Sequence, residues 1–162
     1  MHHELDPITM PCASTSLRSA ARAVSRGYDA ALGGGGITIN QFAILRRIAR
    51  AGELPLSRLA ERLVMDRTSL YRALEPMTRA GWIRLDPAPR GRARIARLTP
   101  QGVAIMNAGA PAWEEEQTAL ITAFGSERWR ALHAELRDLI ATVAQVDRSR
   151  RAGGPGNRRP RP

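Results

Sequence analysis

The stretch 56–99 constrains the fold most, because helical, turn and strand patterns follow one another in it without interruption. Its first part has apolar residues at helical spacing, which are Leu56, Leu59, Ala60 and Leu63. Val64 and Met65 then form a turn, and Asp66 is placed to cap the next helix with its carboxylate. That helix directs Leu70, Leu74 and Met77 inward. The pattern predicts two short amphipathic helices joined by a tight turn.

A hairpin is predicted to follow the second helix. Gly81 is a natural stop for that helix, and residues 82–86 and 92–98 then alternate with the period of two that is typical of strands. Gly91 permits a tight turn between them. Helix, turn, helix and hairpin predict a winged helix-turn-helix in a mainly α-helical protein, with about six helices and a small antiparallel β-wing.

The second helix carries polar and cationic side chains on its first two turns. They are Arg67, Thr68, Ser69, Tyr71 and Arg72. Arginine can pair with guanine through two hydrogen bonds, and the hydroxyls can bind phosphates or base edges. The ring of Tyr71 either packs inward or rests on a phosphate. The alternative to DNA contact for the group is an ordinary solvated helix face.

Arginines also gather at the predicted hairpin tip, where they are Arg90, Arg92 and Arg94. An arginine at such a tip can enter the minor groove, where narrow A·T tracts concentrate negative potential. The alternative is a basic hairpin that touches only phosphates. Both readings predict double-stranded DNA as the partner.

The order of several segments is typical of a known protein family. They are L-S-R-L-A-E-R-L, D-R-T-S-L-Y-R, A-G-W-I, the Arg-rich hairpin and L-T-P-Q-G. From about residue 12 to 145 the chain resembles the MarR (multiple antibiotic resistance regulator) family. The resemblance implies a homodimeric transcriptional regulator, usually a repressor, that responds to a small aromatic ligand or an oxidant. It also assigns the minor-groove contact to Arg92. The family usually has an acidic residue near the position of Arg90, so the wing here is expected to attract DNA more strongly and less selectively.

The remaining segments complete the predicted organisation. Residues 1–11 are expected to be flexible, residues 12–147 to form a single domain with its winged helix-turn-helix at 38–99, and the Arg-rich tail 148–162 to be disordered. Helices are predicted at 14–32, 100–124 and 127–146, with a flexible Gly joint at 33–36 and a kink or break at Gly109 and Pro111. These three helices, from both ends of the chain, are too apolar to stand alone. They predict a two-fold dimer, with recognition helices about 34 Å apart on a palindromic operator.

Charge is divided unevenly along the chain, which carries 25 Arg, no Lys and a net charge of +10. Residues 38–99 hold 13 Arg against 5 acidic residues, whereas residues 100–147 hold 3 Arg against 7 acidic residues. The tail adds six further arginines. This division favours a polyanionic partner for the predicted DNA-reading segment. A sequence-neutral architectural protein, in which arginine content alone binds DNA, is the competing function.

The sequence leaves open two ways in which DNA binding could be regulated. An organic anion could be anchored by Arg18, Arg22 or Arg26, with His133 as a weaker candidate, although exposed arginines are usually solvated or paired with an acid. Alternatively, Cys12 lies before a predicted helix, where the helix dipole stabilises a thiolate, so the protein could be a redox-responsive repressor. The sensor position in the hydroperoxide-sensing branch of the family falls nearer Ser14, which favours the organic ligand.

Other classes of function lack a sequence signal. No metalloprotease, serine-hydrolase or nucleotide-binding motif is present, so we expect neither an enzyme nor a cofactor. A single Cys excludes a multi-Cys zinc site, and no metal is expected. No apolar run approaches the roughly 20 residues of a membrane span. We therefore expect a bacterial, nucleoid-associated protein of the cytoplasm that does not bind membranes.

Overall fold

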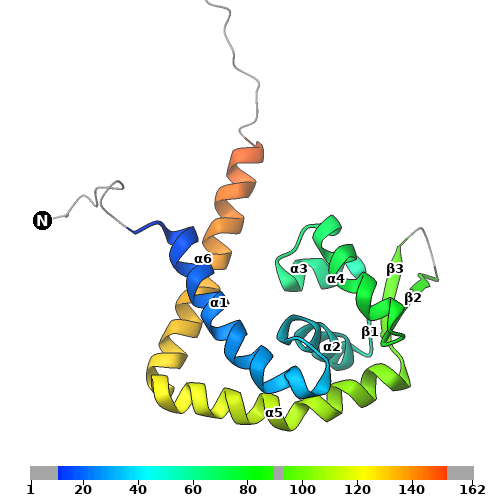
Figure 1. The fold of residues 1–162 in the computed structure, drawn as a ribbon. Coiled ribbons are helices and arrows are strands. Elements are labelled where there is room, and N and C mark those ends of the chain that lie inside the picture. The colour runs from blue at the N-terminus through cyan, green and yellow to red at the C-terminus, as the bar shows by residue number, and fades with distance from the viewer. Residues whose placement is uncertain (1–10, 90–92, 153–162) are drawn as a thin grey trace, which may run out of the picture. The chain divides into compact units, whose positions relative to one another are not determined.

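The computed structural model describes residues 11–89 and 93–152. In chain order the elements are α1 (Ala13–Leu32), the 3-10 turn η1 (Gly33–Gly35), α2 (Ile39–Ala51), β1 (Glu53–Pro55), α3 (Leu56–Leu63), α4 (Arg67–Arg79), β2 (Ile83–Pro87), β3 (Arg94–Leu98), α5 (Pro100–Phe124) and α6 (Ser126–Ala152) (Figure 1). The described chain divides into two compact units between Gln117 and Thr118. The mainly helical fold with a small antiparallel sheet confirms the predicted fold class.

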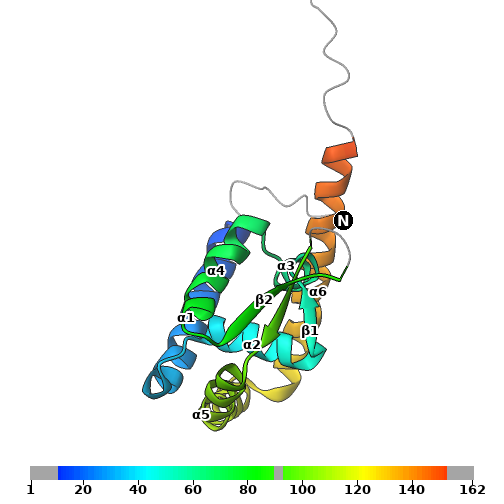
Figure 2. The same ribbon diagram turned by 90° about the vertical axis from the view of Figure 1, so that its right-hand side faces the viewer.

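The core of the first unit gathers the inner faces of α2, α3 and α4 against the sheet. Leu45, Ile48, Leu59, Leu70, Leu74 and Met77 are fully buried. Leu59, Leu70, Leu74 and Met77 were expected from helical spacing, and on α2 Ile44 is buried as well. The strand order is β1-β3-β2, with Glu53 opposite Arg97 and Ile83 opposite Leu98. Figure 2 shows α4 beside β2.

Local hydrogen bonds explain where these helices begin. The Thr38 hydroxyl accepts from the Gln41 amide and the Gln41 side chain accepts from the Thr38 amide, which together form a capping box at the start of α2. The Asp29 carboxylate on α1 also accepts from the Ile39 amide at 2.7 Å. A carboxylate at this end is favourable because the helix dipole is positive there. The start of α2 is thus held by two neighbouring segments.

The turn between α3 and α4 holds Val64 in an unusual conformation. Its φ is +53°, a left-handed value that β-branched residues rarely adopt. The Val64 amide donates to the carbonyls of Ala60 and Glu61, which ends α3, and the Val64 side chain is 70% exposed. This confirms the predicted turn and shows that its geometry is maintained against a backbone preference.

Thr99 joins three segments at the start of α5. Its hydroxyl donates to the Gly81 carbonyl at 2.6 Å and accepts from the Gly102 amide at 3.0 Å. Its amide donates to the Trp82 carbonyl at 3.0 Å. Gly81, with φ +74°, directs the chain out of α4, as predicted. The end of α4, the start of β2 and the first turn of α5 therefore meet at one residue.

Residues 33–35 of the predicted Gly joint form a 3-10 turn, and the flexibility of the joint stays a prediction. Two other expectations were wrong in part, namely a break in α5 and a disordered tail that begins at residue 148. Helix α5 continues through Gly109 and Pro111 without a break, because Gly109 is buried against Leu32 and Phe42 and this packing supports the helix where the proline removes a hydrogen bond. Helix α6 extends to Ala152, so residues 148–152 are helical. The rest of the predicted tail, and residues 1–10, lie outside the described residues.

Candidate nucleic-acid interface

The N-terminus of α4 is fixed by its cap. One oxygen of Asp66 accepts from the Ser69 amide at 2.9 Å, and the other accepts from the Ser69 hydroxyl at 2.6 Å. These hydrogen bonds stabilise the carboxylate and lower the pKa of Asp66 below its usual range. The predicted cap is therefore present. Because the Ser69 hydroxyl donates to Asp66, it is part of the cap, and its hydrogen atom is not available to another acceptor.

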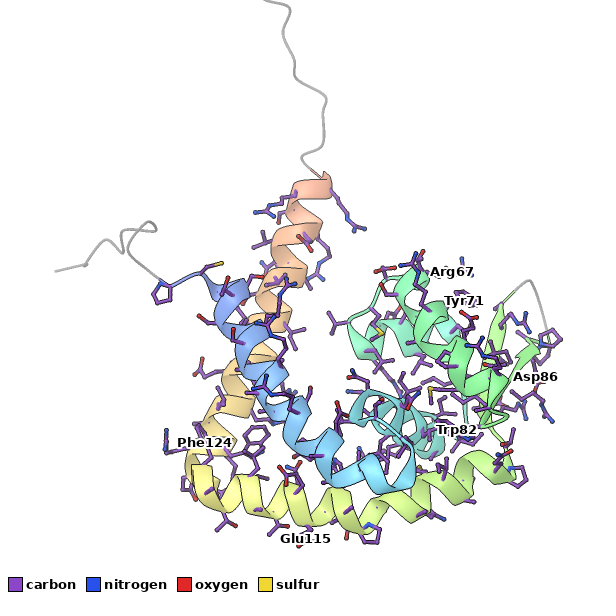
Figure 3. All side chains as sticks on the ribbon, in the orientation of Figure 1. Arg67, Tyr71, Trp82, Asp86, Glu115 and Phe124 are labelled. Carbon is purple, nitrogen blue, oxygen red and sulfur yellow. The ribbon has the colours of Figure 1, made fainter. Side chains whose placement is uncertain are left out.

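The outer face of the first two turns of α4 is open to solvent. Arg67, Thr68, Tyr71 and Arg72 are all exposed, while Leu70 between them is fully buried. Figure 3 shows Arg67 and Tyr71 projecting from the same end of the helix. Tyr71 is 38% exposed and is not among the core residues. The structure thus exposes all five side chains predicted on this helix, although the Ser69 hydroxyl is bound to Asp66. Their contacts with DNA stay a prediction.

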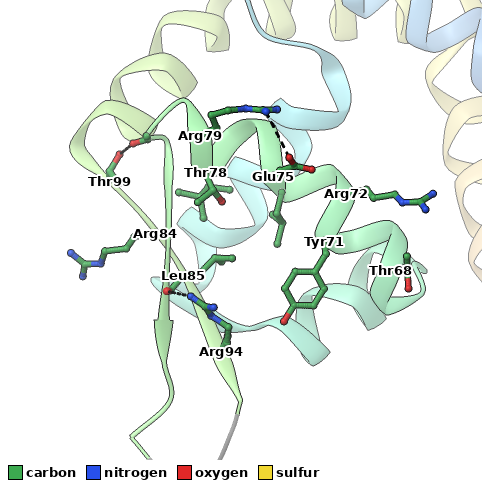
Figure 4. Close-up of a pocket in the computed structure, with 13 residues that line it drawn as sticks. Thr68, Tyr71, Arg72, Glu75, Thr78, Arg79, Arg84, Leu85, Arg94 and Thr99 are labelled. Atoms are coloured by element: carbon green, nitrogen blue, oxygen red, sulfur yellow. Dashed lines mark hydrogen bonds and ion pairs between the residues drawn. The ribbon is translucent and has the colours of Figure 1, made fainter.

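Arg94 is the one arginine of the predicted hairpin tip that lies within the described residues. The Arg94 guanidinium donates to the Leu85 carbonyl at 2.8 Å, so Arg94 links β3 to β2 and lies in front of α4 (Figure 4). Arg90 and Arg92 lie outside the described residues. The predicted minor-groove contact of Arg92 therefore stays a prediction.

A solvent-open hollow of about 1030 Å³ separates α4 from the sheet. Its lining includes Thr68, Tyr71 and Arg72 from the predicted group, together with Arg79, Arg84 and Arg94 (Figure 4). Sequence reasoning missed Arg79 and Arg84. Arg79 follows Arg72 by two helical turns, and Arg84 lies at an alternating strand position, so periodicity could have identified both. In the structure Arg79 forms an ion pair with Glu75 at 3.7 Å.

A network of ion pairs connects the three strands. Arg84 Nε lies 2.8 Å from Asp86 Oδ1, and Arg97 Nε lies 3.6 Å from Asp86 Oδ2. Arg97 also pairs with Glu53 on β1. Glu53 and Arg84 both lie opposite Arg97 in the sheet register, where cross-strand pairs stabilise a sheet. The network fixes the sheet that carries the wing, and it was not predicted.

The residues suggested as a ligand anchor lie on two helices. Arg18 and Arg22 donate to Ser14 and Ser19 of their own helix, and Arg26 is exposed on α1. His133 is on α6, stacked on Trp129 with ring centroids 6.3 Å apart. An organic-anion site formed by these side chains stays a prediction.

Cys12 occupies the N-cap position of α1 and is exposed. The pKa of its thiol is lowered, first by a hydrogen bond from the Thr15 side chain, then by the amides of Thr15 and Ser14 and by the charge of Arg18. These groups stabilise a thiolate, which is the reactive form of cysteine.

Within residues 11–89 and 93–152, no group of three or more His, Cys, Asp or Glu side chains is suited to hold a metal ion. In the same residues, no helix is long and apolar enough to cross a membrane.

The exposed helix, its cap and the adjacent sheet define a winged helix-turn-helix protein. A family model described as "MarR family" matches residues 37–90. A solved structure of the M. tuberculosis transcriptional regulator MosR in complex with DNA is similar over 85% of this chain and 99% of that chain, with 31% identity and a TM-score of 0.76. The chain belongs to the MarR family of transcriptional regulators.

Other solved structures are similar at lower identity. A probable transcriptional regulator from Pseudomonas aeruginosa has 25% identity and a TM-score of 0.69, over 78% of this chain and 96% of that one. A mutant of E. coli MarR complexed with operator DNA has 21% identity and a TM-score of 0.70, over 78% and 91%, and supports the fold alone. A search of curated protein sequences gave no match.

Proposed function

We propose that this chain is a repressor that binds a palindromic DNA operator as a homodimer and is released by a small organic ligand. The observation that carries the DNA contact is the exposed group Arg67, Thr68, Tyr71 and Arg72 beside the arginine-bearing wing. A helix of 13 residues is about 20 Å long and fits the major groove, which is about 12 Å wide. The DNA complex of MosR, which shares 31% identity with this chain, supports the same partner.

Exposed apolar side chains support the homodimer. On α1 they include Leu17 and Val24, and on α6 they include Leu132, Leu139, Ile140, Val143 and Val146. Helix α6 has no buried residue in the described chain. Apolar rows of this length are normally covered, and a second copy of the chain would cover them. Release by an organic ligand rests on membership of the family.

Control by oxidants through Cys12 is a second candidate. Its support is the exposed thiol with a lowered pKa at the start of α1, in a helix that also belongs to the proposed dimer surface.

Substitutions on α4 test the DNA contact. Selection from random duplexes with the full chain supplies the operator, and DNA affinity is then measured at fixed salt. We expect Arg67→Ala or Arg72→Ala to weaken operator binding by about 1–3 kcal/mol and to relax the preference at one base pair. Arg137→Ala, on the exposed surface of α6, is the matched control and should leave affinity unchanged.

Two outcomes would contradict this proposal. Equal losses on operator and random DNA would reduce the arginine to a phosphate contact. A selection that enriches no palindrome would instead support sequence-neutral, architectural binding.

A further inference from the structure

The side of α2 that faces α5 carries an aromatic and cationic cluster. The Arg46 guanidinium lies over the Trp113 ring, 3.9 Å from its centroid, and 5.7 Å from the centroid of Phe42. The two rings are themselves 5.8 Å apart and tilted by 34°. A cation over an aromatic face is attracted to the ring, and the guanidinium N–H groups stay able to donate to a further partner. The cluster therefore holds Arg46 beside an apolar wall as a potential donor.

The positive charge at this cluster is not neutralised within the described residues. Arg47 and Arg50 lie within one turn of Arg46, and none of the three forms an ion pair or donates a side-chain hydrogen bond to residues 11–89 or 93–152. Like charges four positions apart on a helix repel each other. Partial burial and then Arg50 lower the pKa of Arg46, and Glu114 opposes that shift. An anion placed here would relieve the repulsion.

The cluster surrounds a solvent-open hollow of about 310 Å³. Its lining is Phe42, Ala43, Arg46, Arg47, Arg50 and Trp113, which we name the α2–α5 hollow. Its volume is at the small end of the roughly 300–1,000 Å³ found for ligand pockets. None of these residues lines the hollow between α4 and the wing. A ligand in the α2–α5 hollow would therefore not occupy the surface proposed to contact DNA.

We propose that the α2–α5 hollow binds a phosphomonoester attached to a flat ring. Three guanidinium groups match the charge of about −1.5 to −2 on a phosphomonoester better than the single charge of a carboxylate. Arginine pairs with phosphate oxygens through parallel hydrogen bonds. Phe42, Ala43 and Trp113 form the apolar wall that a ring needs. A regulatory effect of this ligand on DNA binding rests on the proposed function. Binding of the ligand to the hollow does not depend on it.

Calorimetric titration of the full chain without DNA tests the site. Phenyl phosphate is the probe. Inorganic phosphate, which lacks the ring, and benzoate, which has the ring but no phosphate, are the comparison ligands. We expect phenyl phosphate to bind at least about tenfold more tightly than either, because charge-assisted hydrogen bonds and ring contacts add. Arg46→Gln and Arg50→Gln should each weaken phenyl phosphate about tenfold, whereas the control Arg137→Gln should not change it.

The variants also separate packing from anion recognition. Arg46→Lys keeps the charge but not the planar fork, so it should fall between the wild type and Arg46→Gln. Equal binding of phenyl phosphate and benzoate, or no loss in Arg46→Gln and Arg50→Gln, would overturn the site. Because the titration contains no DNA, phenyl phosphate binding by a chain that selects no operator would preserve the site and refute the proposed function. Operator binding without phenyl phosphate binding would refute the site and leave the proposed DNA binding intact.

Discussion

Cys12 and Thr15 form a local pair at the start of α1, in which the threonine hydroxyl is the largest cause of the lowered thiol pKa. A lowered pKa increases the thiolate fraction at neutral pH, and the thiolate is the form that reacts with alkylating agents and oxidants. The position of Cys12 at a helix start could be read from the sequence. The effect of Thr15 on the thiol pKa could not, because it depends on where the first turn of α1 places the threonine hydroxyl.

We expect the rate of Cys12 alkylation by iodoacetamide to rise with pH around a midpoint below 9.0, the ordinary value. Thr15→Val should move that midpoint upward, and Arg18→Gln should move it less, since Arg18 is the smallest of the causes. An unchanged midpoint in Thr15→Val would remove the physical basis for oxidant sensing. Retention of peroxide-dependent DNA release in Cys12→Ser would exclude that function directly.

At the scale of single elements, the first turn of α5 touches the segment before β2 more closely than any side chain would allow. A Cβ atom at Gly102 would lie 2.0 Å from the carbonyl oxygen of Trp82, which belongs to the backbone and cannot rotate away. That oxygen already accepts the Thr99 amide. Gly102 is therefore required by the contact between α5 and the chain leaving α4.

Gly102→Ala should lower the free energy of unfolding by about 1–3 kcal/mol, as expected for overpacking. The matched control is Gly34→Ala, because a Cβ atom there meets nothing within 4 Å. This control should be neutral or raise stability by up to about 1 kcal/mol through the unfolded state. Urea unfolding at equal protein concentration measures the free energy of unfolding of both variants. Equal effects of the two substitutions would show that the structure accommodates a Cβ atom at Gly102 without a loss of stability.

Local signals decided which elements were predicted well. The caps at Thr38 and Asp66 and the alternation in residues 82–98 depend on neighbours in sequence, so α2, α4 and the wing followed from the sequence. The end of α6 did not, because residues 148–152 lack apolar periodicity. Arginine and alanine nevertheless favour helix, and Arg150 pairs with Asp147 at 3.9 Å, so the helix continues. Arg46 and Trp113 are far apart in sequence, and no local pattern reports their contact.

At the scale of the whole molecule, the exposed apolar row of α6 is the strongest support for a second copy. Ile140 and Val143 are 50% and 51% exposed. In a dimer that covers them, a carboxylate at either position would be buried without a partner, which costs several kcal/mol. Apolar periodicity predicted this row, but the sequence alone does not say whether the row is covered within one chain.

The double substitution Ile140→Glu and Val143→Glu should convert the protein from dimer to monomer in sedimentation experiments and reduce operator affinity. Ala134→Glu, at an exposed position on the opposite side of α6 by helical spacing, is the control and should stay dimeric. A wild-type chain that sediments as a monomer, or a double variant that stays dimeric, would contradict the assignment of this surface.

The junction at Thr99 has a consequence for motion. Thr99 donates to the carbonyls of Gly81 and Trp82, directly after α4, and accepts from the Gly102 amide in the first turn of α5. A rotation of that first turn must either break these bonds or displace residues 80–82 with it. Since Trp82 in turn donates to the Met77 carbonyl, the displacement would continue into the last turn of α4. We therefore expect a displacement of the beginning of α5 to be transmitted to α4 at its C-terminal end.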